Sequence, residues 1–474
     1  MLLLTELLKD WPCTVSGGGI RTSVTGITEN SSRVQKGFVF VARKGGRNDG
    51  TIYIQQAIDQ GAVAIVVDRT DLISLPDDIT VVIVPDCKLF IAHACARFAG
   101  YPARRMKVIA VTGTNGKTTV THFIGQLLQS LGNRPVVIGT TGIFIDGVKI
   151  DYDSPQMTTL PAEYLHPLLQ KCEGMGVTHV VLEASSLGLA SRRLDYCEID
   201  IGILLNIGTD HYEEHGGKLA YILAKKRLSQ MVTMMVVNGE DEQCVQMVQD
   251  TTTPVVYFGM NPLAGVPVSD LEKNFVIPGH YNRMNALAAM SALVVLGYSL
   301  DDVMQYCGQL QLPEGRLQQL ERDGVKVYID YAHTPDALQA VLCTLSTCCY
   351  GKLITVFGCG GNRDKGKRAE MGELAVLYSS NVIVTSDNPR NEDPLAIIGD
   401  ILEGFGGDCS AVEVILDRKN AIRKAVFSAA PGDSVLIAGK GHEKTQQTAD
   451  GILPFSDFEV AKRALFEKTF LDFK

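Results

Sequence analysis

The sequence lacks the patterns that mark disulfide-rich, zinc-binding and membrane-spanning proteins. It has 12 cysteines among 474 residues, but no two of them form a C-x-x-C pair. This spacing favours reduced thiols that serve as small hydrophobic residues over zinc sites or disulfides. No apolar run approaches the length that a bilayer span needs. There is also no internal repeat and no low-complexity tract.

Positive charge is in deficit. The chain has 44 Lys and Arg against 53 Asp and Glu, a formal net charge of −9. An acidic protein binds nucleic acid poorly, so any anionic ligand must be held by local basic sites. The segment Met1–Leu8 is short and contains Glu6, and we therefore expect no secretory leader. These features predict a cytoplasmic protein with neither nucleic-acid nor membrane partners.

The chain is too long for one hydrophobic core, and its pattern predicts three domains, 1–102, 103–312 and 313–474. Tyr101-Pro102 and Pro313-Glu314-Gly315 mark the two boundaries. Apolar strands alternate with helical segments in each part, which indicates an α/β fold with mostly parallel sheets. The expected strands are 37–42, 62–67, 80–84, 108–111, 136–139, 179–183, 202–206, 234–237, 325–330, 353–357, 382–386, 413–415 and 434–438. The expected helices include 89–100, 120–131 and 283–297.

The strongest single motif follows the apolar strand Val108–Val111. It reads Gly113-Thr114-Asn115-Gly116-Lys117-Thr118-Thr119 and precedes a segment with helical apolar spacing. A strand, a glycine loop and a helix N-terminus together form a phosphate site, to which a lysine adds a full charge. A threonine at the loop's end can bind the Mg²⁺ that travels with a nucleotide. The loop departs from the G-x-x-x-x-G-K-[ST] spacing, because Val111 stands where the first glycine belongs.

Three other polar groups of the central domain are ambiguous on their own. Glu183 can bind Mg²⁺, or Ser185 or Ser186 can cap a helix and leave Glu183 solvated. Asn206–His211 fits turn chemistry better than a metal or phosphate site. Lys225-Lys226-Arg227 reads as a solvated basic helix face.

Polar loops follow four strands of the last domain. The loops are Asp330–Pro335, Gly358–Arg368, Ser386–Arg390 and Gly439–Glu443. Loops that follow parallel strands meet at one edge of the sheet, where ligands bind. This mixture of acidic, basic and glycine residues predicts a site for a small zwitterion. Carboxylates would bind its ammonium group, and Arg363 or Arg390 would bind its carboxylate with a two-point fork.

Taken together, these motifs resemble the Mur ligase family of ATP-dependent, amide-forming enzymes of peptidoglycan synthesis. The resemblance covers nearly the whole chain, and the short T-G-T-N-G-K-T-T loop is typical of that family. It implies a small α/β UDP-binding domain, a central P-loop ATPase-like domain and a C-terminal Rossmann-like domain. Asp387-Asn388-Pro389-Arg390 matches the D-N-P-R motif of members that add meso-2,6-diaminopimelate. Diaminopimelate has a second carboxylate that lysine lacks, which gives the motif's arginine a physical reason.

The resemblance implies that ATP and Mg²⁺ are used and that the small-molecule substrates are UDP-N-acetylmuramoyl-L-alanyl-D-glutamate and diaminopimelate. The expected catalytic residues are Lys117, Glu183, His211 and Lys225. Lys225 matches the position that is carbamylated in this family, where it would help Thr118, Glu183 and His211 to bind metal. Either His211 or the Lys225 carbamate would accept the proton of the attacking amine. The expected ATP contacts are Gly113, Thr114, Asn115, Gly116, Lys117, Thr118, Thr119, Asn282, Arg316 and Asp330.

The two other substrates are implied to occupy different parts of the chain. The UDP-sugar peptide would contact Asn30, Ser32, Gly46, Arg47, Asn48, Thr158, Thr159, Ser185 and Arg193. Diaminopimelate would contact Arg363, Asp387, Asn388, Arg390, Gly439 and Glu443. The sequence does not show the oligomeric state, and we expect a monomer.

Four residues depart from the family pattern, all on the UDP-sugar peptide and phosphate side. Ser31 replaces an aspartate, Leu187 a histidine, Thr209 an arginine and Ser191 a glutamine. Two alternatives therefore stay open. One is a related ligase that adds another amino acid, such as L-lysine, or acts on another carboxylate, such as a folate-polyglutamate or cyanophycin-type substrate. Ser32 and Arg47 argue against a folate-type member. The other is a weakened paralogue that only binds nucleotide-sugars.

Overall fold

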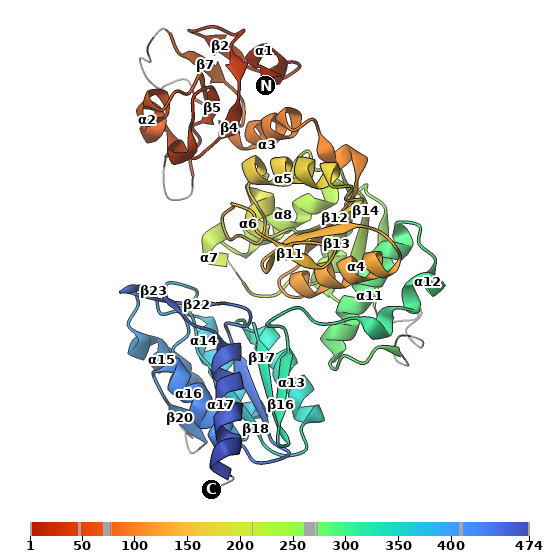
Figure 1. Cartoon of the computed structure of the whole chain (residues 1–474), viewed down its shortest axis with the longest axis vertical. Helices are drawn as coiled ribbons and strands as arrows, with labels where there is room; N and C mark the ends of the chain where they lie inside the picture. Colours follow the sequence, from red (N-terminus) through yellow and green to blue (C-terminus); the bar gives the residue numbers. More distant parts are fainter. Residues whose placement is uncertain are drawn as a thin grey trace.

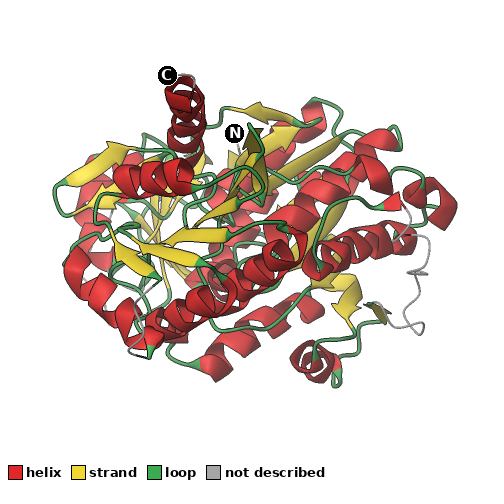
Figure 2. Ribbon diagram, turned by 90° about the horizontal axis from the view of Figure 1, so that it is seen from below, coloured by secondary structure: helices red, strands yellow, loops and turns green. Residues whose placement is uncertain are grey.

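The computed structural model describes residues 2–45, 49–69, 76, 78–210, 212–259, 271, 274–406 and 411–472. Three main sheets follow one another along the longest axis of the molecule (Figure 1). Seen from below, helices surround the strands (Figure 2). Among the described residues, no helix is both long and apolar enough to cross a membrane.

The N-terminal sheet has five strands in the order β2-β7-β6-β5-β4. Strands β4 to β7 are parallel, and β2 joins β7 antiparallel. Helix α3 packs its apolar residues, such as Phe90 and Ile91, against one face of this sheet. The elements are β1 Leu2–Leu3, α1 Leu4–Leu7, β2 Thr14–Ser16, β3 Ser23–Val24, β4 Gly26–Thr28, η1 Ser31–Arg33, β5 Phe38–Val41, η2 Gly50–Tyr53, α2 Ile54–Asp59, β6 Ala64–Val67, β7 Thr80–Ile83 and α3 Cys87–Phe98.

The central sheet has eight strands in the order β11-β10-β9-β12-β8-β13-β14-β15. Successive residues of β8 enter opposite cores: Val108 and Ala110 pack on one face, and Ile109 and Val111 on the other. The strands are β8 Lys107–Thr112, β9 Pro135–Gly139, β10 Gly142–Ile145, β11 Val148–Ile150, β12 His179–Glu183, β13 Ile199–Leu204, β14 Val232–Asn238 and β15 Val255–Phe258. The helices are η3 Pro102–Arg105, α4 Lys117–Ser130, α5 Ala162–Gly174, α6 Ser186–Ala190, α7 Tyr212–His215, α8 Lys218–Lys226, η4 Arg227–Gln230, α9 Glu242–Val248, α11 His280–Val295, α12 Leu300–Met304 and η5 Cys307–Gln309.

The last sheet has six strands in the order β16-β17-β21-β18-β19-β20, and only β16 is antiparallel to its neighbour. Buried residues of α13, α14 and α15 share one core, and those of α16 and α17 share another. The strands are β16 Gln318–Arg322, β17 Val325–Asp330, β18 Leu353–Phe357, β19 Asn381–Val384, β20 Val412–Val414 and β21 Ser434–Ala438, with a separate hairpin of β22 Thr445–Thr448 and β23 Gly451–Pro454. The helices are α13 Pro335–Cys348, α14 Lys367–Tyr378, α15 Pro394–Leu402, η6 Glu403–Phe405, α16 Arg418–Ser428 and α17 Asp457–Asp472.

The predicted α/β class with mostly parallel sheets is confirmed. The strands of each main sheet come from one predicted domain, whereas the boundaries at 102 and 312 stay predictions. Strand β13 begins at Ile199, three residues before the expected start at 202. The prediction missed the antiparallel β10–β11 hairpin, although its two-residue Asp146-Gly147 turn is a known hairpin signal.

Candidate active site

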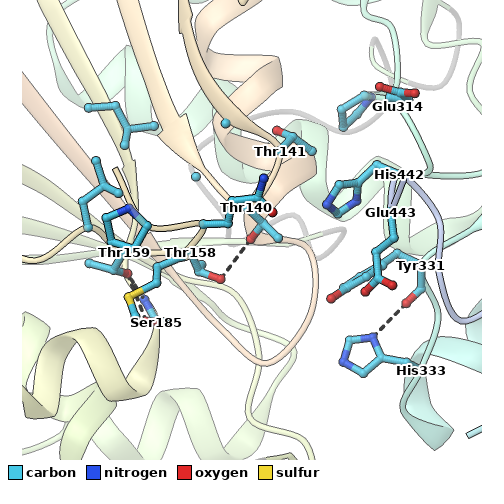
Figure 3. A pocket seen from close by; sticks show the side chains of 18 of the residues that line it. Thr140, Thr141, Thr158, Thr159, Ser185, Glu314, Tyr331, His333, His442 and Glu443 are labelled. Carbon is cyan, nitrogen blue, oxygen red and sulfur yellow. Dashed lines mark hydrogen bonds between the residues drawn. The ribbon is translucent and has the colours of Figure 1, made fainter. Parts of the chain in front are cut away.

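A cleft of about 1410 Å³ lies between the central and last domains. Figure 3 shows Thr140, Thr141, Thr158, Thr159 and Ser185 on one side and Tyr331, His333, His442 and Glu443 on the other. The threonines and Ser185 lie in loops that follow strands of the central sheet. On the facing side, Tyr331 and His333 follow β17, and His442 and Glu443 follow β21. The carboxyl edges of two parallel sheets therefore face one cleft, as expected for ligand sites in α/β folds.

The predicted phosphate loop joins β8 to α4. Gly116 has φ +89°, and a Cβ there would lie 2.5 Å from Oδ1 of Asn285, so a side chain is excluded on two counts. Asn206 fixes the loop through both amide atoms, because its Oδ1 accepts from Asn115 N (2.8 Å) and its Nδ2 donates to Asn115 O (3.1 Å). The strand, glycine loop and helix expected from the sequence are therefore present.

Lys117 lies over this loop. Its Nζ donates to the carbonyl oxygens of Gly113 (2.8 Å) and Thr114 (2.9 Å). Desolvation lowers the pKa of the Lys117 amine, and the carboxylates of Glu183 and Asp210 partly oppose that shift. The two neutral carbonyls leave the lysine's charge uncompensated at short range, which suits an incoming phosphate.

Glu183 is the last residue of β12, next to Val111 of β8 in the sheet. Its side chain is only 1% exposed. Its two carboxylate oxygens accept from the backbone N (2.9 Å) and Oγ1 (3.0 Å) of Thr140. Ser185 does cap α6, accepting from Gly188 N at 3.1 Å. The capping alternative is thus right about Ser185 and wrong about a solvated Glu183.

Lys225 overturns the interpretation of residues 225–227 as a solvated face. It is 2% exposed, and its Nζ lies 3.5 Å from Oγ1 of Thr112, at the end of β8. Desolvation, reinforced by the charge of Lys117, lowers the pKa of the Lys225 amine well below its ordinary value. Its neighbours Lys226 and Arg227 pair with Asp250 and Asp195. The sequence could not separate them, because burial here depends on how α8 packs on β8.

Arg316 brings a guanidinium group from outside the loop to the phosphate site. Arg316 donates from Nη2 to Oγ1 of Thr118 at 3.1 Å and stacks on the Tyr331 ring, 4.6 Å from its centroid. Asn282 is 1% exposed, and its Oδ1 is buried without a hydrogen-bond partner among the described residues. Such an atom is costly to bury unless a ligand satisfies it. Thr119 is buried in the first turn of α4.

Asp330 accepts two backbone hydrogen bonds and holds the segment next to Arg316. Its Oδ2 accepts from Leu317 N (2.6 Å) and its Oδ1 from Ala332 N (2.7 Å). Burial raises the pKa of the Asp330 carboxyl, and Arg316 partly opposes the shift. Both oxygens are therefore engaged with backbone, so Asp330 fixes the segment that carries Arg316.

Residues expected to hold the UDP-sugar peptide fall into two groups. Thr159 Oγ1 donates to Glu183 O (2.7 Å) and lies 3.0 Å from Ser185 Oγ, while Arg193 donates to Thr159 O (2.8 Å). The hydroxyl oxygens of Thr158 and Thr140 lie 3.1 Å apart, within hydrogen-bond distance (Figure 3). Asn30 instead caps η1 of the first domain by accepting from Ser32 N at 3.1 Å, and neither residue lines the cleft. Four predicted site residues lie outside the described part of the chain: Gly46, Arg47, Asn48 and His211.

The predicted zwitterion edge has the expected loops side by side, since β17, β21, β18 and β19 are consecutive in the sheet. Asn388 joins two of the loops: its Nδ2 donates to Glu443 (2.9 Å), and its Oδ1 accepts from Lys440 (2.8 Å). Asp387 is buried, and its Oδ2 has no hydrogen-bond partner among the described residues. Burial raises the pKa of this carboxyl, while Arg418 and Lys440 oppose the shift. Gly439 has φ +115°, and a Cβ there would lie 2.6 Å from Asp387 Oδ2.

The two candidate arginines differ in their partners. Arg363 forms an ion pair with Glu214 of α7, across the cleft. Arg390 donates from Nη1 to Gly361 O (2.8 Å) and from Nε to Gln447 Oε1 (3.2 Å). Among the described residues, no acidic side chain forms an ion pair with Arg390. Within the part of the chain that the structure describes, the Arg390 guanidinium therefore has only neutral hydrogen-bond acceptors as partners.

Sequence reasoning missed two buried cations behind this edge. Lys440 is fully buried and pairs with Glu443 at 2.7 Å. Arg418 is also fully buried and makes a two-point pair with Asp457 (2.8 and 2.7 Å). The glycine-flanked Lys440 has a recognisable signal, whereas Arg418 looks like any helix-surface arginine in the sequence.

Near the phosphate loop, one hydroxyl group and one carboxylate could bind Mg²⁺. Thr118 and Glu183 supply oxygen atoms, the ligands that Mg²⁺ prefers. Within the described ranges, no three His, Cys, Asp or Glu side chains form a cluster for a metal. A full site would need a further anion, and Lys225 lies where a carbamate would supply one.

Models of three protein families match successive parts of the chain. They are described as "Mur ligase family, catalytic domain" (residues 23–108), "Mur ligase middle domain" (111–293) and "Mur ligase, glutamate ligase domain" (315–441). The fold and the facing sites define an ATP-dependent ligase. The chain belongs to the Mur ligase family.

Similar proteins bear closely related names. A Clostridium acetobutylicum protein named UDP-N-acetylmuramoyl-L-alanyl-D-glutamate–2,6-diaminopimelate ligase 2 is 34% identical over 98% of this chain and 99% of its own. The Pseudomonas aeruginosa ligase of that name, without the final numeral, is 37% identical over 93% and 94%. A solved structure with that same name has a TM-score of 0.64 at 31% identity, covering 94% and 95%. A Thermotoga maritima MurF ligase in complex with ADP shares the fold (TM-score 0.59, 18% identity, covering 94% and 99%).

Proposed function

We propose that this chain adds meso-2,6-diaminopimelate to UDP-N-acetylmuramoyl-L-alanyl-D-glutamate, at the expense of ATP, in peptidoglycan precursor synthesis. One observation carries the proposal. The phosphate loop follows β8 at the sheet edge whose neighbouring loops line the cleft, and the D-N-P-R motif lines the cleft from the last domain, with Arg390 held by neutral acceptors only among the described residues. The names of the relatives support the same substrates.

ATP would bind along the loop, with its phosphates on the backbone N–H groups of Gly113–Thr119 and on Lys117. The Oδ1 of Asn282 supports a nucleotide contact, since the atom is buried and has no hydrogen-bond partner among the described residues. Arg316 would have to exchange its bond to Thr118 for a phosphate when ATP and metal arrive. Asp330 would act through the segment that it fixes.

Mg²⁺ would be held by Thr118, Glu183 and a carbamate on Lys225, with His211 as a further ligand. When bound, it offsets negative charge on the phosphates. Only a neutral amine reacts with carbon dioxide, and the lowered pKa of Lys225 supports that form at neutral pH. The Nζ lies on Thr112, next to the phosphate loop, so an anion formed there would face the same space as the loop.

The reaction would proceed in two steps. The γ-carboxylate of the D-glutamyl residue attacks the γ-phosphorus, and the products are an acyl phosphate and ADP. The amine of diaminopimelate then attacks the acyl carbon, and inorganic phosphate leaves. Lys117 would steady the transferred phosphoryl group by charge and position. Closure of the last domain on the central one would bring the amine to the acyl phosphate and keep water out.

The UDP-sugar peptide would contact Asn30, Ser32, Gly46, Arg47 and Asn48 in the first domain and would continue past Thr158, Thr159, Ser185 and Arg193. Asp387 and Glu443 would bind the ammonium groups of diaminopimelate, and Arg390 and Arg363 its carboxylates, with Asn388 and Gly439 shaping the pocket. The three parts of this account correspond to domains 1–102, 103–312 and 313–474. The protein would act as a monomer in the cytoplasm.

The test is phosphate release from ATP by the purified protein with the UDP-linked dipeptide and either meso-diaminopimelate or L-lysine. We expect release that requires the dipeptide and is much faster with diaminopimelate, and none with Lys117→Ala. Equal or faster release with lysine would reject the assigned amino acid. Binding of the nucleotide-sugar without any ATP turnover would instead favour the weakened paralogue.

A further inference from the structure

The hairpin β22–β23 contacts the D-N-P-R motif along one strand. Gln447 makes three of these contacts: its N donates to Asn388 Oδ1 (2.9 Å), its O accepts from Arg390 N (3.1 Å), and its Oε1 accepts from Arg390 Nε (3.2 Å). A two-stranded hairpin outside the main sheet thus holds both the backbone and the side chain of Arg390.

The backbone conformation of Arg390 is unfavourable by itself, so contacts with neighbouring segments must stabilise it. It has φ +55°, in the left-handed region that few residues with a side chain adopt. Its guanidinium lies on the glycine loop, where Nη1 donates to Gly361 O and a Cβ on Gly360 would lie 3.0 Å away. The loop thus holds Nη1, and Gln447 holds Nε.

The neighbouring Gln446 gives the contrast. Side chains of successive strand residues point to opposite sides, and Gln447 lines the cleft whereas Gln446 does not. Gln446 donates from Nε2 to the backbone O of Asp387 at 2.7 Å, so it ties the hairpin to the same motif. Both glutamines are half-buried, but only Gln447 contacts the guanidinium.

We propose that Gln447 is the positioning residue that aims the Arg390 guanidinium at the far carboxylate of the amino-acid substrate. A neutral amide suits this task, because an acidic partner in its place would compete with the substrate carboxylate for the same charge. The inference rests on the proposed function and adds a specificity residue to it.

The experiment measures kcat and KM for diaminopimelate and for ATP in Gln447→Met and Gln447→Ala, with Gln446→Ala as the matched control. The methionine keeps the length of the side chain and removes its amide group, including the Oε1 acceptor. We expect both Gln447 variants to raise KM for diaminopimelate about fivefold, the typical net effect of losing one hydrogen bond. We expect kcat and the KM for ATP to stay within about twofold. In Gln446→Ala, KM for diaminopimelate should also stay within about twofold.

A second arm places Gln447→Met on an Arg390→Ala background. If Gln447 acts through Arg390, this double variant should have the KM of Arg390→Ala within about twofold, because effects of coupled residues do not add. Three results would overturn the inference: an equal KM rise in Gln446→Ala, a joint change of kcat and both KM values, or the full fivefold effect on the Arg390→Ala background. A wild-type protein that does not use diaminopimelate contradicts the proposed function, whereas normal use with unaffected Gln447 variants contradicts only this inference.

Discussion

The phosphate loop and the amino-acid edge each have two cations nearby, and the two pairs are held in opposite ways. Around the phosphate loop, the amines of Lys117 and Lys225 contact backbone carbonyls and a threonine hydroxyl. Behind the amino-acid edge, the cations Lys440 and Arg418 are buried in ion pairs with Glu443 and Asp457. The first side keeps positive charge available for groups that arrive and leave. The second uses paired charges to fix the shape of a recognition surface.

The largest effect is expected on the phosphate side. Lys225→Ala should lower kcat by at least about 10³-fold, since it removes a group that stabilises developing charge. Added bicarbonate should not restore activity. Lys226→Ala is the matched control, because this neighbour is half-exposed and pairs only loosely with Asp250. Phosphate-release assays measure both, and a fully active Lys225→Ala enzyme would rule out the carbamate.

The next effect is on stability at the amino-acid side. Arg418→Met should lower the free energy of unfolding by about 3 kcal/mol, because Asp457 would stay buried without its partner. Arg423→Met provides the control: it breaks another pair between α16 and α17, with Glu467, whose side chains are 35% and 39% exposed. That loss should stay below about 1 kcal/mol. Urea unfolding measures both losses of free energy. Equal losses would show that the buried ion pair stabilises the fold no more than the more exposed pair does.

A smaller effect concerns selection of the substrate. Arg390→Lys keeps the charge but loses the planar fork, and it should raise KM for diaminopimelate about 20-fold with little change in KM for ATP. Steady-state kinetics with each substrate varied in turn measure this. An unchanged KM for diaminopimelate would mean that Arg390 does not make a two-point contact.

The smallest predicted effect is a change in the free energy of unfolding with pH. Burial lowers the pKa of His166, in the core of the central domain, and of His333, at the cleft, to about 4. The unfolded chain binds protons on these histidines near pH 6.5 and the folded chain does not, so stability falls as the pH drops from 6.5 towards 4. His166 should contribute about 1 kcal/mol of loss between pH 7 and pH 5.5. Thermal unfolding of His166→Leu should show that much less dependence; an unchanged profile would contradict the assignment.

The two sides also differ in how far the sequence predicts them. The phosphate loop is contiguous, so the spacing of Gly113, Gly116 and Lys117 is enough to predict strand, loop and helix. The amino-acid edge is assembled from four loops, and their shared edge follows from strand order alone. The burial of Lys225 and the pairing of Arg418 with Asp457 depend on helix packing between distant segments, which no local pattern records. Gln447 belongs to a hairpin whose turn residues, Ala449 and Asp450, precede Gly451, but its target is 57 residues away.

A competition in one reaction measures directly which amino acid the protein adds. The protein is given ATP, the UDP-linked dipeptide and equal concentrations of meso-diaminopimelate and L-lysine, and the two products, which differ by one carboxylate group, are counted by mass spectrometry. Their ratio is the ratio of the two kcat/KM values. We expect a product that is almost entirely the diaminopimelate adduct. The preference for diaminopimelate over lysine should be smaller in Arg390→Lys. An excess of the lysine adduct, or a ratio near one, would contradict it.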